Sequence, residues 1–309
     1  ISGFTLTNGD SDLDQDGLGS GGGMHIDNSD LSVENLHITN NYASHNAGGV
    51  LINECSPHFK HVLISDNITD GSGGGIVLYG FGAPTHPIFE NVTITGNQAS
   101  DAYGEGGISF WYGAELTLVN SIVSGNTPYE IGLTSWGANT LNVSYSNIEG
   151  GTEEGIFFGE DDTVNWGDGN IDLDSRFIDA QNDNYNLFAS SRLINAGDPN
   201  LTDSDGSRSD IGAYPYLNVY EGEAGWSVST DTGDDIIGTG DPNGTPFATI
   251  QAGLNFARDD QTVNVANGTY YELGGDVFTN NAGQEELVHV VWPDSTYKKG
   301  VQLLGEDSE

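Results

Sequence analysis

Closely spaced aspartates are the residues of this sequence whose types and spacing best suit a chemical role. Asp12, Asp14 and Asp16 alternate with other residues and are followed by Gly17. This D-x-D-x-D-G spacing points alternate carboxylates at one hard cation, and the glycine allows the sharp turn between them. The twelfth loop position is Gly23 where an EF-hand has glutamate, so a complete EF-hand is excluded. The sequence predicts a Ca2+ site in this loop, with a solvated acidic turn as the alternative.

A second acidic loop repeats part of the pattern. Asp203 and Asp205 precede Gly206 and lie near Asp198 and Asp210 in the sequence. A calcium site and a solvated turn fit this loop equally. The composition supports bound cations, because 46 acidic and 7 basic side chains give a net charge of -39. Such a charge opposes compaction unless divalent or abundant monovalent cations bind. Ca2+ is the predicted cofactor, and a salt-adapted, solvated surface is the equal alternative.

The same charge excludes two classes of partner. An acidic chain repels nucleic acid and anionic membrane surfaces, because its long-range field has the wrong sign for both. No apolar run approaches the ~20 residues of a membrane span, and the sequence contains no signal peptide. We therefore expect no nucleic acid partner, no membrane insertion, and a chain that is a processed piece or a fragment. The single Cys55 forms no internal disulfide.

A repeat supplies the elements that must position these residues. Segments such as NLHITNN, HVLISDN and NVTITGN recur, and the repeated motif ends at residues 9, 41, 67, 97, 126 and 151. One turn per ~25–30 residues is the size of a coil in a β-solenoid. Alternating apolar residues predict two stacked core columns, formed by Val33, Phe59, Phe89 and Leu118, and by Ile38, Ile64, Ile94, Val123 and Ile148.

An asparagine recurs at the turn that closes each repeat. Asn41, Asn67, Asn97 and Asn126 occupy this position. Asparagine suits turns and can hydrogen-bond to a stacked copy of itself, so we predict an internal asparagine ladder. The fold class predicted from these patterns is all-β, a right-handed parallel β-helix.

These repeats resemble right-handed parallel β-helix proteins of the pectate-lyase-like superfamily. The pairing of GGGI with FENVTITGN (residues 73–76 and 89–97) also resembles the repeats of chlamydial polymorphic outer-membrane proteins. Residues 170–216, with the runs AGD and DIGAY, resemble the closing segment of secreted bacterial surface proteins with variable C-terminal anchors. Asp174-Ser175-Arg176 stands where that family usually has Asp-Pro before the phenylalanine. The resemblance implies β-helix coils over residues 1–169, a closing segment over 170–216, and an extracellular or cell-surface location.

Residues 217–309 resemble the N-terminal cap and first coil of a following unit in the same superfamily. Thr245-Pro246 predicts a helix start, and four apolar residues fall on one helical face: Phe247, Ile250, Leu254 and Ala257. Residues 262–266 and 270–273 are predicted strands. In the family, a segment like VQLLGEDSE is followed shortly by one like ISGFTL, the first residues here. The chain is therefore either a fragment of a tandem array or a subunit that completes the coils of the next copy head to tail.

Many members of this superfamily cleave acidic polysaccharides, so a carbohydrate-active enzyme is the competing hypothesis. A lyase acting on uronates needs a base and cations, yet Lys60 is the only basic side chain between residues 1 and 175. A hydrolase needs two carboxylates ~5–9.5 Å apart, and no pair is distinguished from the acidic background. The Gly-His-Gly and Arg-x-Lys motifs of polygalacturonases are absent. No catalytic residue is predicted, and an enzyme is the less favoured reading.

Outward-facing apolar residues predict a contact surface. If Val50 and Ile76 face inward, Leu51 and Val77 face outward, and four aromatic residues cluster at the adjacent bend: Tyr79, Phe81, Trp111 and Tyr112. Exposed aromatic groups stack on sugars or become buried in protein contacts. The predicted function is an extracellular structural or adhesive β-helix, stabilised by calcium, whose partners are copies of itself or a surface glycan.

Overall fold

The computed structural model describes residues 1–11, 19–100, 104–258, 260–268 and 270, and the short strands at 278–279, 285–286 and 302–305. The chain divides into two compact units. Unit 1 comprises residues 1–173 and 211–213, and unit 2 comprises residues 174–210 and 214–309. Each unit is described by itself below.

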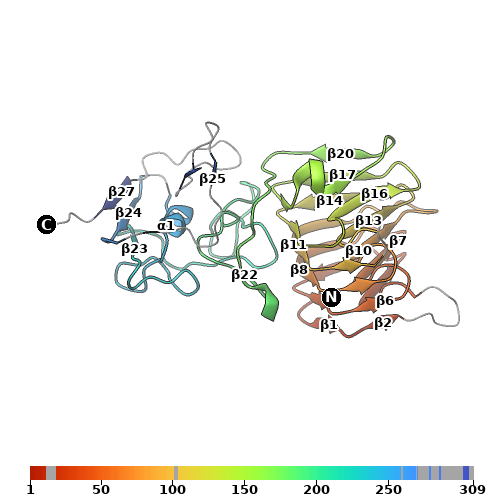
Figure 1. The fold of residues 1–309 in the computed structure, drawn as a ribbon, viewed down its shortest axis with the longest axis horizontal. Coiled ribbons are helices and arrows are strands. Elements are labelled where there is room, and N and C mark those ends of the chain that lie inside the picture. The colour runs from red at the N-terminus through yellow and green to blue at the C-terminus, as the bar shows by residue number, and fades with distance from the viewer. Residues whose placement is uncertain are drawn as a thin grey trace. The chain divides into compact units, whose positions relative to one another are not determined.

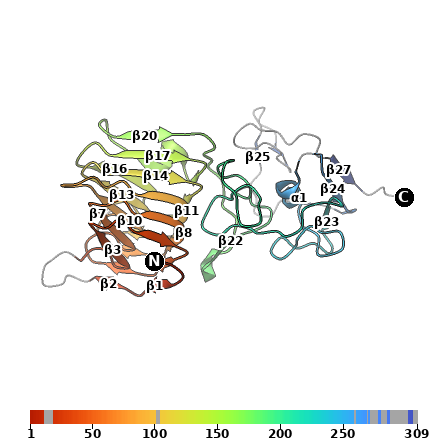
Figure 2. The same ribbon diagram turned by 180° about the vertical axis from the view of Figure 1, so that it is seen from behind.

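Unit 1 is a stack of coils whose strands form three parallel sheets (Figures 1 and 2). The prediction of an all-β parallel β-helix is therefore confirmed. The first sheet consists of β1 (Thr5–Thr7), β5 (His37–Thr39), β8 (His58–Ser65), β11 (Ile88–Thr95), β14 (Glu115–Val119), β17 (Thr140–Ser144) and β20 (Thr163–Trp166), with β4 (Ser32–Glu34), β15 (Ile122–Ser124) and β18 (Asn147–Ile148) alongside.

Two further sheets complete the coils. The second consists of β3 (Met24–Asp27), β7 (Val50–Asn53), β10 (Ile76–Tyr79), β13 (Ile108–Trp111), β16 (Ile131–Ser135) and β19 (Ile156–Phe157). The third, which was not predicted, consists of the two-residue strands β2 (Asp10–Ser11), β6 (Tyr42–Ala43), β9 (Ile68–Thr69) and β12 (Gln98–Ala99). A π-helical turn (Gly151–Gly155) precedes β19.

The core of unit 1 is built from the predicted apolar columns. Phe59 is paired with Val33 on one side and with Phe89 on the other, and Phe89 with Leu118. The isoleucine column is continuous from Ile38 to Ile148 through parallel pairs. All the members of both columns are buried. Each coil thus places its apolar side chains directly over those of its neighbour, which buries a continuous core.

The asparagine ladder is confirmed and is buried. The side-chain amide of Asn41 donates to Oδ1 of Asn67 at 2.9 Å, and the same bond joins Asn67 to Asn97 and Asn97 to Asn126. Each of the four amides also donates to a backbone carbonyl of another coil, on Leu6, Ile38, Ile64 and Ile94. The amides thereby satisfy polar groups inside the turn, which would be costly to bury unpaired.

Residues 211–213 add a short segment to unit 1. The backbone N–H of Gly212 donates to the carbonyl of Asn120 at 2.8 Å, and that of Ala213 donates to Oγ1 of Thr93 at 2.9 Å. The side-chain amide of Asn91 donates to the Gly212 carbonyl at 3.3 Å. Part of the DIGAY run in the predicted closing segment is therefore hydrogen-bonded to the coils of unit 1.

Unit 2 contains a second set of parallel strands. β23 (Trp226–Val228), β24 (Thr262–Val265) and β27 (Gln302–Gly305) pair in parallel. The unit also contains a 3-10 turn (Ala180–Asn182) and two antiparallel pairs, β21 (Phe177–Asp179) with β22 (Asn184–Leu187) and β25 (Phe278–Thr279) with β26 (Glu285–Glu286). The predicted strand at 270–273 lies outside the described residues beyond Tyr270.

One helix, α1 (Ile250–Phe256), packs on β23 and β24. It begins four residues later than the Thr245-Pro246 prediction, because Thr249 is the N-cap and its Oγ1 accepts from the N–H of Ala252 at 3.2 Å. The buried carboxylate of Asp235 accepts from the N–H of Ala248 and the hydroxyl of Thr249, at 2.8 and 2.7 Å. Of the four predicted helix residues, Phe247, Leu254 and Ala257 are buried and Ile250 is half-buried.

Candidate binding surface

Five aromatic rings gather where the strands of the second sheet end. Tyr79 and Trp111 are the last residues of β10 and β13, and they are paired in register. Tyr112 is the centre of the group, because its ring lies 4.9 Å from that of Tyr79, 5.1 Å from Phe81, 6.3 Å from Trp111 and 5.5 Å from Trp136. We call these five residues, Tyr79, Phe81, Trp111, Tyr112 and Trp136, the aromatic cluster.

The aromatic cluster is open to solvent at two of its members. Phe81 is 61% exposed and Trp136 is 65% exposed, whereas the other three are partly buried. Trp111 is fixed in place because its indole N–H donates to Oγ of Ser109 at 2.8 Å. Large exposed aromatic residues grouped in this way mark a contact surface.

The structure brings four of the predicted contact residues together, and the other two are not exposed as predicted. Tyr79, Phe81, Trp111 and Tyr112 belong to the cluster, as expected for one bend. Leu51 is half-buried on β7, and Val77 on β10 is only 2% exposed. Val77 does not reach solvent because the corner at Gly73 lies against its side chain, so close that a Cβ at Gly73 would lie 2.4 Å from Cγ2 of Val77. The outward alternation of a strand therefore fails to predict exposure at this position.

Trp136 is the member of the cluster that sequence reasoning missed. Trp111 and Ser135, the last residues of β13 and β16, are paired. The residues that follow them, Tyr112 and Trp136, therefore lie at the same corner. A β-bulge between Ser109 and Trp111 shifts this pairing, so simple counting along the repeat does not find it. The run Ser-Trp-Gly after an apolar strand, like the run Trp-Tyr-Gly in the coil before it, was the available signal.

The backbone at this corner is left-handed in four coils. Asn28, Glu54, Tyr112 and Trp136 follow the ends of β3, β7, β13 and β16 and have φ values of 49°, 50°, 59° and 42°. Asparagine tolerates this conformation, whereas a bulky side chain there costs roughly 1–2 kcal/mol. Tyr112 and Trp136 thus occupy positions that local backbone preference disfavours, as Glu54 does in an earlier coil.

The electrostatic surroundings of the cluster are acidic. Burial, together with the neighbouring Tyr112 and Glu54, raises the pKa of the Tyr79 phenol. The Glu54 side chain lies beside the Phe81–Gly82 corner, since a Cβ at Gly82 would lie 2.7 Å from Oε1 of Glu54. A carboxylate thus lies beside the rings, which disfavours an anionic ligand.

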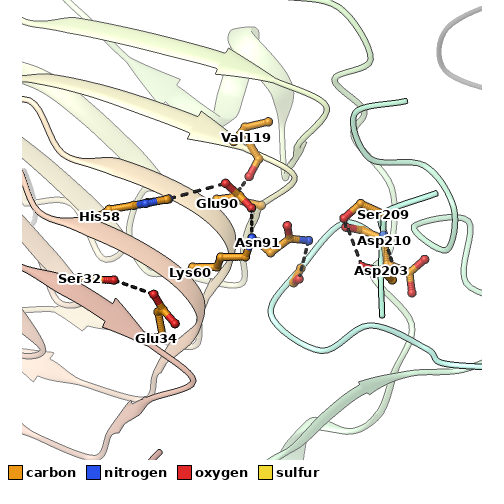
Figure 3. A network of polar contacts seen from close by, with 12 residues as sticks. Ser32, Glu34, His58, Lys60, Glu90, Asn91, Val119, Asp203, Ser209 and Asp210 are labelled. Carbon is orange, nitrogen blue, oxygen red and sulfur yellow. Dashed lines mark hydrogen bonds and ion pairs between the residues drawn. The ribbon is translucent and has the colours of Figure 1, made fainter. Parts of the chain in front are cut away.

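A group of charged side chains lies on the first sheet. Figure 3 shows Lys60 and His58 pointing toward Glu90. The Lys60 ammonium is 2.5 Å from Oε1 of Glu90, and Nε2 of His58 is 3.7 Å from Oε2. Glu34 accepts a hydrogen bond from the Ser32 hydroxyl at 2.7 Å. Because Lys60 is the only basic residue before Arg176, its pairing with Glu90 leaves the coils without an uncommitted Lys or Arg base.

The second predicted calcium loop lies in unit 2, where its carboxylates accept hydrogen bonds. Asp205 accepts from the N–H and hydroxyl of Ser207 and from the N–H of Asn218, and these bonds lower its pKa despite burial. Asp203 accepts from the N–H of Asp210 at 2.9 Å and from the Ser209 hydroxyl (Figure 3). The pKa of Asp210 is raised well above its ordinary value by burial and by the charge of Asp203.

Comparison with known proteins identifies a family. The family model described as "Periplasmic copper-binding protein (NosD)" matches residues 5–187. No match was found among curated proteins or among solved structures. None of the helices in the described part of the chain is long and apolar enough to cross a membrane.

The family description corrects the predicted cofactor. The expectation of Ca2+ is wrong, because the matching family is described as copper-binding. The prediction failed because the spacing of the aspartates indicates only that carboxylates could bind a hard cation. It gives no information about the softer ligands that copper prefers. Asp12, Asp14 and Asp16 lie outside the described residues.

The described residues do not fit a copper centre either. Copper favours imidazole, thiolate and thioether ligands. Within the described ranges, no group of three or more His, Cys, Asp or Glu side chains could hold a metal ion. His25 and His37 are paired with leucines in the next coil, and not with further histidines. Cys55 is buried, donates to the Ile26 carbonyl, and has a thiol whose pKa is raised by burial, which disfavours the ligating thiolate.

Proposed function

Since this chain belongs to the NosD family of periplasmic proteins, we propose that it works in the cell envelope as an adhesive β-helix that contacts a partner through the aromatic cluster. The coil stack serves as a rigid support, because its strands are paired in parallel and its turns are joined by the asparagine ladder. Sites built on such elements are held more precisely than sites on long loops.

The observation that carries this proposal is the exposure of Trp136 and Phe81 around a packed centre. Tyr112 is in contact with four other rings, so the cluster is already assembled before any partner arrives. Aromatic residues that are preorganised in this way lose little conformational entropy on binding. They are also the residues that most often dominate the binding energy of an interface.

The competing carbohydrate-active enzyme has weaker support. A lyase requires a base close to the uronate and cations that offset its carboxylates. Lys60, the one Lys or Arg of the coils, is committed to Glu90. Among the described residues, Glu54 provides a carboxylate beside the aromatic cluster. These observations favour binding over cleavage at this surface.

A sedimentation assay on isolated cell envelopes tests the proposal. We expect labelled full-length chain to bind envelope fragments of a Gram-negative bacterium saturably, and the double variant Phe81→Ser/Trp136→Asn to bind at least tenfold more weakly. Phe157→Asn is the matched control, because Phe157 is 58% exposed and stacks on Tyr129 but lies outside the cluster. Equal binding by the double variant and the parent would contradict the proposal.

A second candidate function is a structural one, as a subunit that associates head to tail with copies of itself. Unit 2 carries three parallel strands, β23, β24 and β27, and unit 1 carries a stack of parallel strands of the same kind. Parallel strands of this kind can pair with those of another copy.

Light scattering across a range of concentrations tests this second candidate. Association through the strand edges predicts a molar mass that rises with concentration, and short filaments in electron micrographs. Thr5→Pro removes one backbone N–H at the edge strand and should reduce the association. A monodisperse monomer at every concentration would exclude head-to-tail assembly.

A further inference from the structure

The aromatic cluster extends along the stack of coils. Tyr79 stands on β10, Trp111 and Tyr112 stand at the end of β13, and Trp136 follows β16. These are three successive coils, spaced about 4.8 Å apart as neighbouring strands of a sheet are. A ligand that contacts all of them spans about 10 Å along the stack, which is about the length of two linked sugar rings.

The rings are arranged to offer a stacking face. The rings of Tyr112 and Trp136 are stacked, with planes 21° apart and centroids 5.5 Å apart. Trp111 stands nearly perpendicular to Trp136, at 78°, and supports it from the side. Trp136 therefore keeps a fixed orientation while 65% of it remains exposed. The apolar C–H face of a sugar ring fits such a surface, because it buries area without needing a charged partner.

The charge near the cluster selects among glycans. The Glu54 carboxylate lies beside the rings, and the chain as a whole carries a net charge of -39. A uronate or sulfated polymer would be repelled at this surface. An uncharged sugar meets no such cost, and the Glu54 carboxylate can accept hydrogen bonds from its hydroxyl groups.

The backbone at the cluster makes asparagine a suitable replacement for testing its role. Trp136 has φ 42° and Tyr112 has φ 59°, and Asn28 and Glu54 adopt the same left-handed conformation at this corner of earlier coils. Asparagine tolerates that conformation better than most other non-glycine residues.

We propose that the aromatic cluster is a binding site for an uncharged polysaccharide, laid along the coil axis across Tyr79, Tyr112 and Trp136. The inference rests on the proposed adhesive function and specifies the ligand class for the same surface. Binding is reversible and breaks no covalent bond.

Affinity electrophoresis of the full chain tests the inference, because the net charge of -39 ensures migration toward the anode. We expect native gels containing hydroxyethyl cellulose or arabinoxylan to retard the parent chain, and gels containing polygalacturonate or alginate to leave its mobility unchanged. Trp136→Asn should weaken retardation by about tenfold or more, as expected for loss of a central aromatic contact. Trp136→Tyr should retain part of the binding, and Phe157→Asn all of it.

The stability of the variants separates a binding role from a structural one. Because asparagine suits φ 42°, Trp136→Asn should keep the melting temperature of the parent while losing the retardation. Equal retardation of parent and Trp136→Asn, or retardation by the anionic polymers alone, would overturn the inference. So would absence of retardation in both neutral gels. If envelope binding still depended on Trp136 in that case, the adhesive function would stand and only the ligand class would fail.

Discussion

Glu130 accepts two hydrogen bonds from Asn126 and thereby ends the asparagine ladder. Its Oε2 lies 2.6 Å from Nδ2 of Asn126, and its Oε1 lies 3.0 Å from the backbone nitrogen of the same residue. In the coils before it, each asparagine makes these two bonds to Oδ1 of the next asparagine. The carboxylate takes over the role of an amide that the next coil does not provide, since residue 151 is glycine.

Replacing this carboxylate should change how stability depends on pH. Burial is the main reason that the pKa of Glu130 rises from 4.5 to about 7. The folded chain therefore holds this proton more tightly than the unfolded chain, and this group makes the fold less stable as pH rises from about 4.5 to about 7. The shift corresponds to a loss of about 3 kcal/mol. Glu130→Gln should abolish that loss.

Chemical denaturation at a series of pH values measures the effect. The free energy of unfolding of the parent, relative to Glu130→Gln, should fall by about 3 kcal/mol between pH 4.5 and 7.5. Glu153→Gln removes an exposed carboxylate from the same region and should leave the pH profile of the parent intact. Parallel profiles for the parent and Glu130→Gln would show that Glu130 does not titrate in this range.

Breaking the ladder in its middle should be costly. Asn97 accepts from the backbone N–H and the side chain of Asn67, and it donates to Asn126 and to the Ile64 carbonyl. Asn97→Ala leaves several buried groups without partners, at about 1–3 kcal/mol for each group. We expect a loss of more than 3 kcal/mol in the free energy of unfolding.

The outer surface of the stack offers the matched control. Asn165 donates to Oδ1 of Asn142 at 2.7 Å in a similar bond between coils, but the bond is exposed to solvent. Asn165→Ala should cost less than about 1 kcal/mol, because water replaces the lost partner. Losses of similar size at both positions would mean that burial does not determine the strength of the ladder.

The left-handed corner makes a further prediction about stability. Trp136→Asn relieves backbone strain of roughly 1–2 kcal/mol and gives up ring contacts of similar value. The free energy of unfolding should therefore stay within about 1 kcal/mol of the parent. Asn28→Trp at the same corner should lose about 1 kcal/mol, because it introduces the strain without the neighbouring rings. A loss above about 3 kcal/mol in Trp136→Asn would assign the indole to structural packing.

The cap of the helix in unit 2 can be tested in the same way. The hydroxyl of Thr249 accepts from the N–H of Ala252 and donates to the buried Asp235. Thr249→Val keeps the shape but loses both bonds, so unit 2 should lose about 1–2 kcal/mol. Thr245→Val, before the helix, should have little effect. The reverse order of these effects would place the helix start at the Thr245-Pro246 position.

The coil architecture is predictable from the sequence because stacking repeats one contact many times. Phe59 and Phe89, or Asn67 and Asn97, fall at the same place in successive repeats, and their spacing alone predicts that they meet. The third sheet was missed because strands of two residues, such as Ile68–Thr69, have no periodicity to detect. The docking of Gly212 on Asn120 was missed because that bond joins segments far apart in the sequence.

The candidate site was predictable only in part. The proximity of Tyr79, Phe81, Trp111 and Tyr112 follows from the register of two strands. Trp136 and Glu130 belong to an irregular coil, in which a bulge and a missing asparagine change the alignment. Ca2+ was predicted incorrectly because the prediction rested on aspartate spacing alone, whereas the matching family is described as copper-binding.

The most direct test of the account is the dissociation constant for isolated cell envelopes, compared between the parent chain and Trp136→Asn. Binding through the aromatic cluster predicts that this single change weakens binding at least tenfold while the melting temperature stays the same. Unchanged affinity in a correctly folded Trp136→Asn variant would contradict the claim that the aromatic cluster makes the contact.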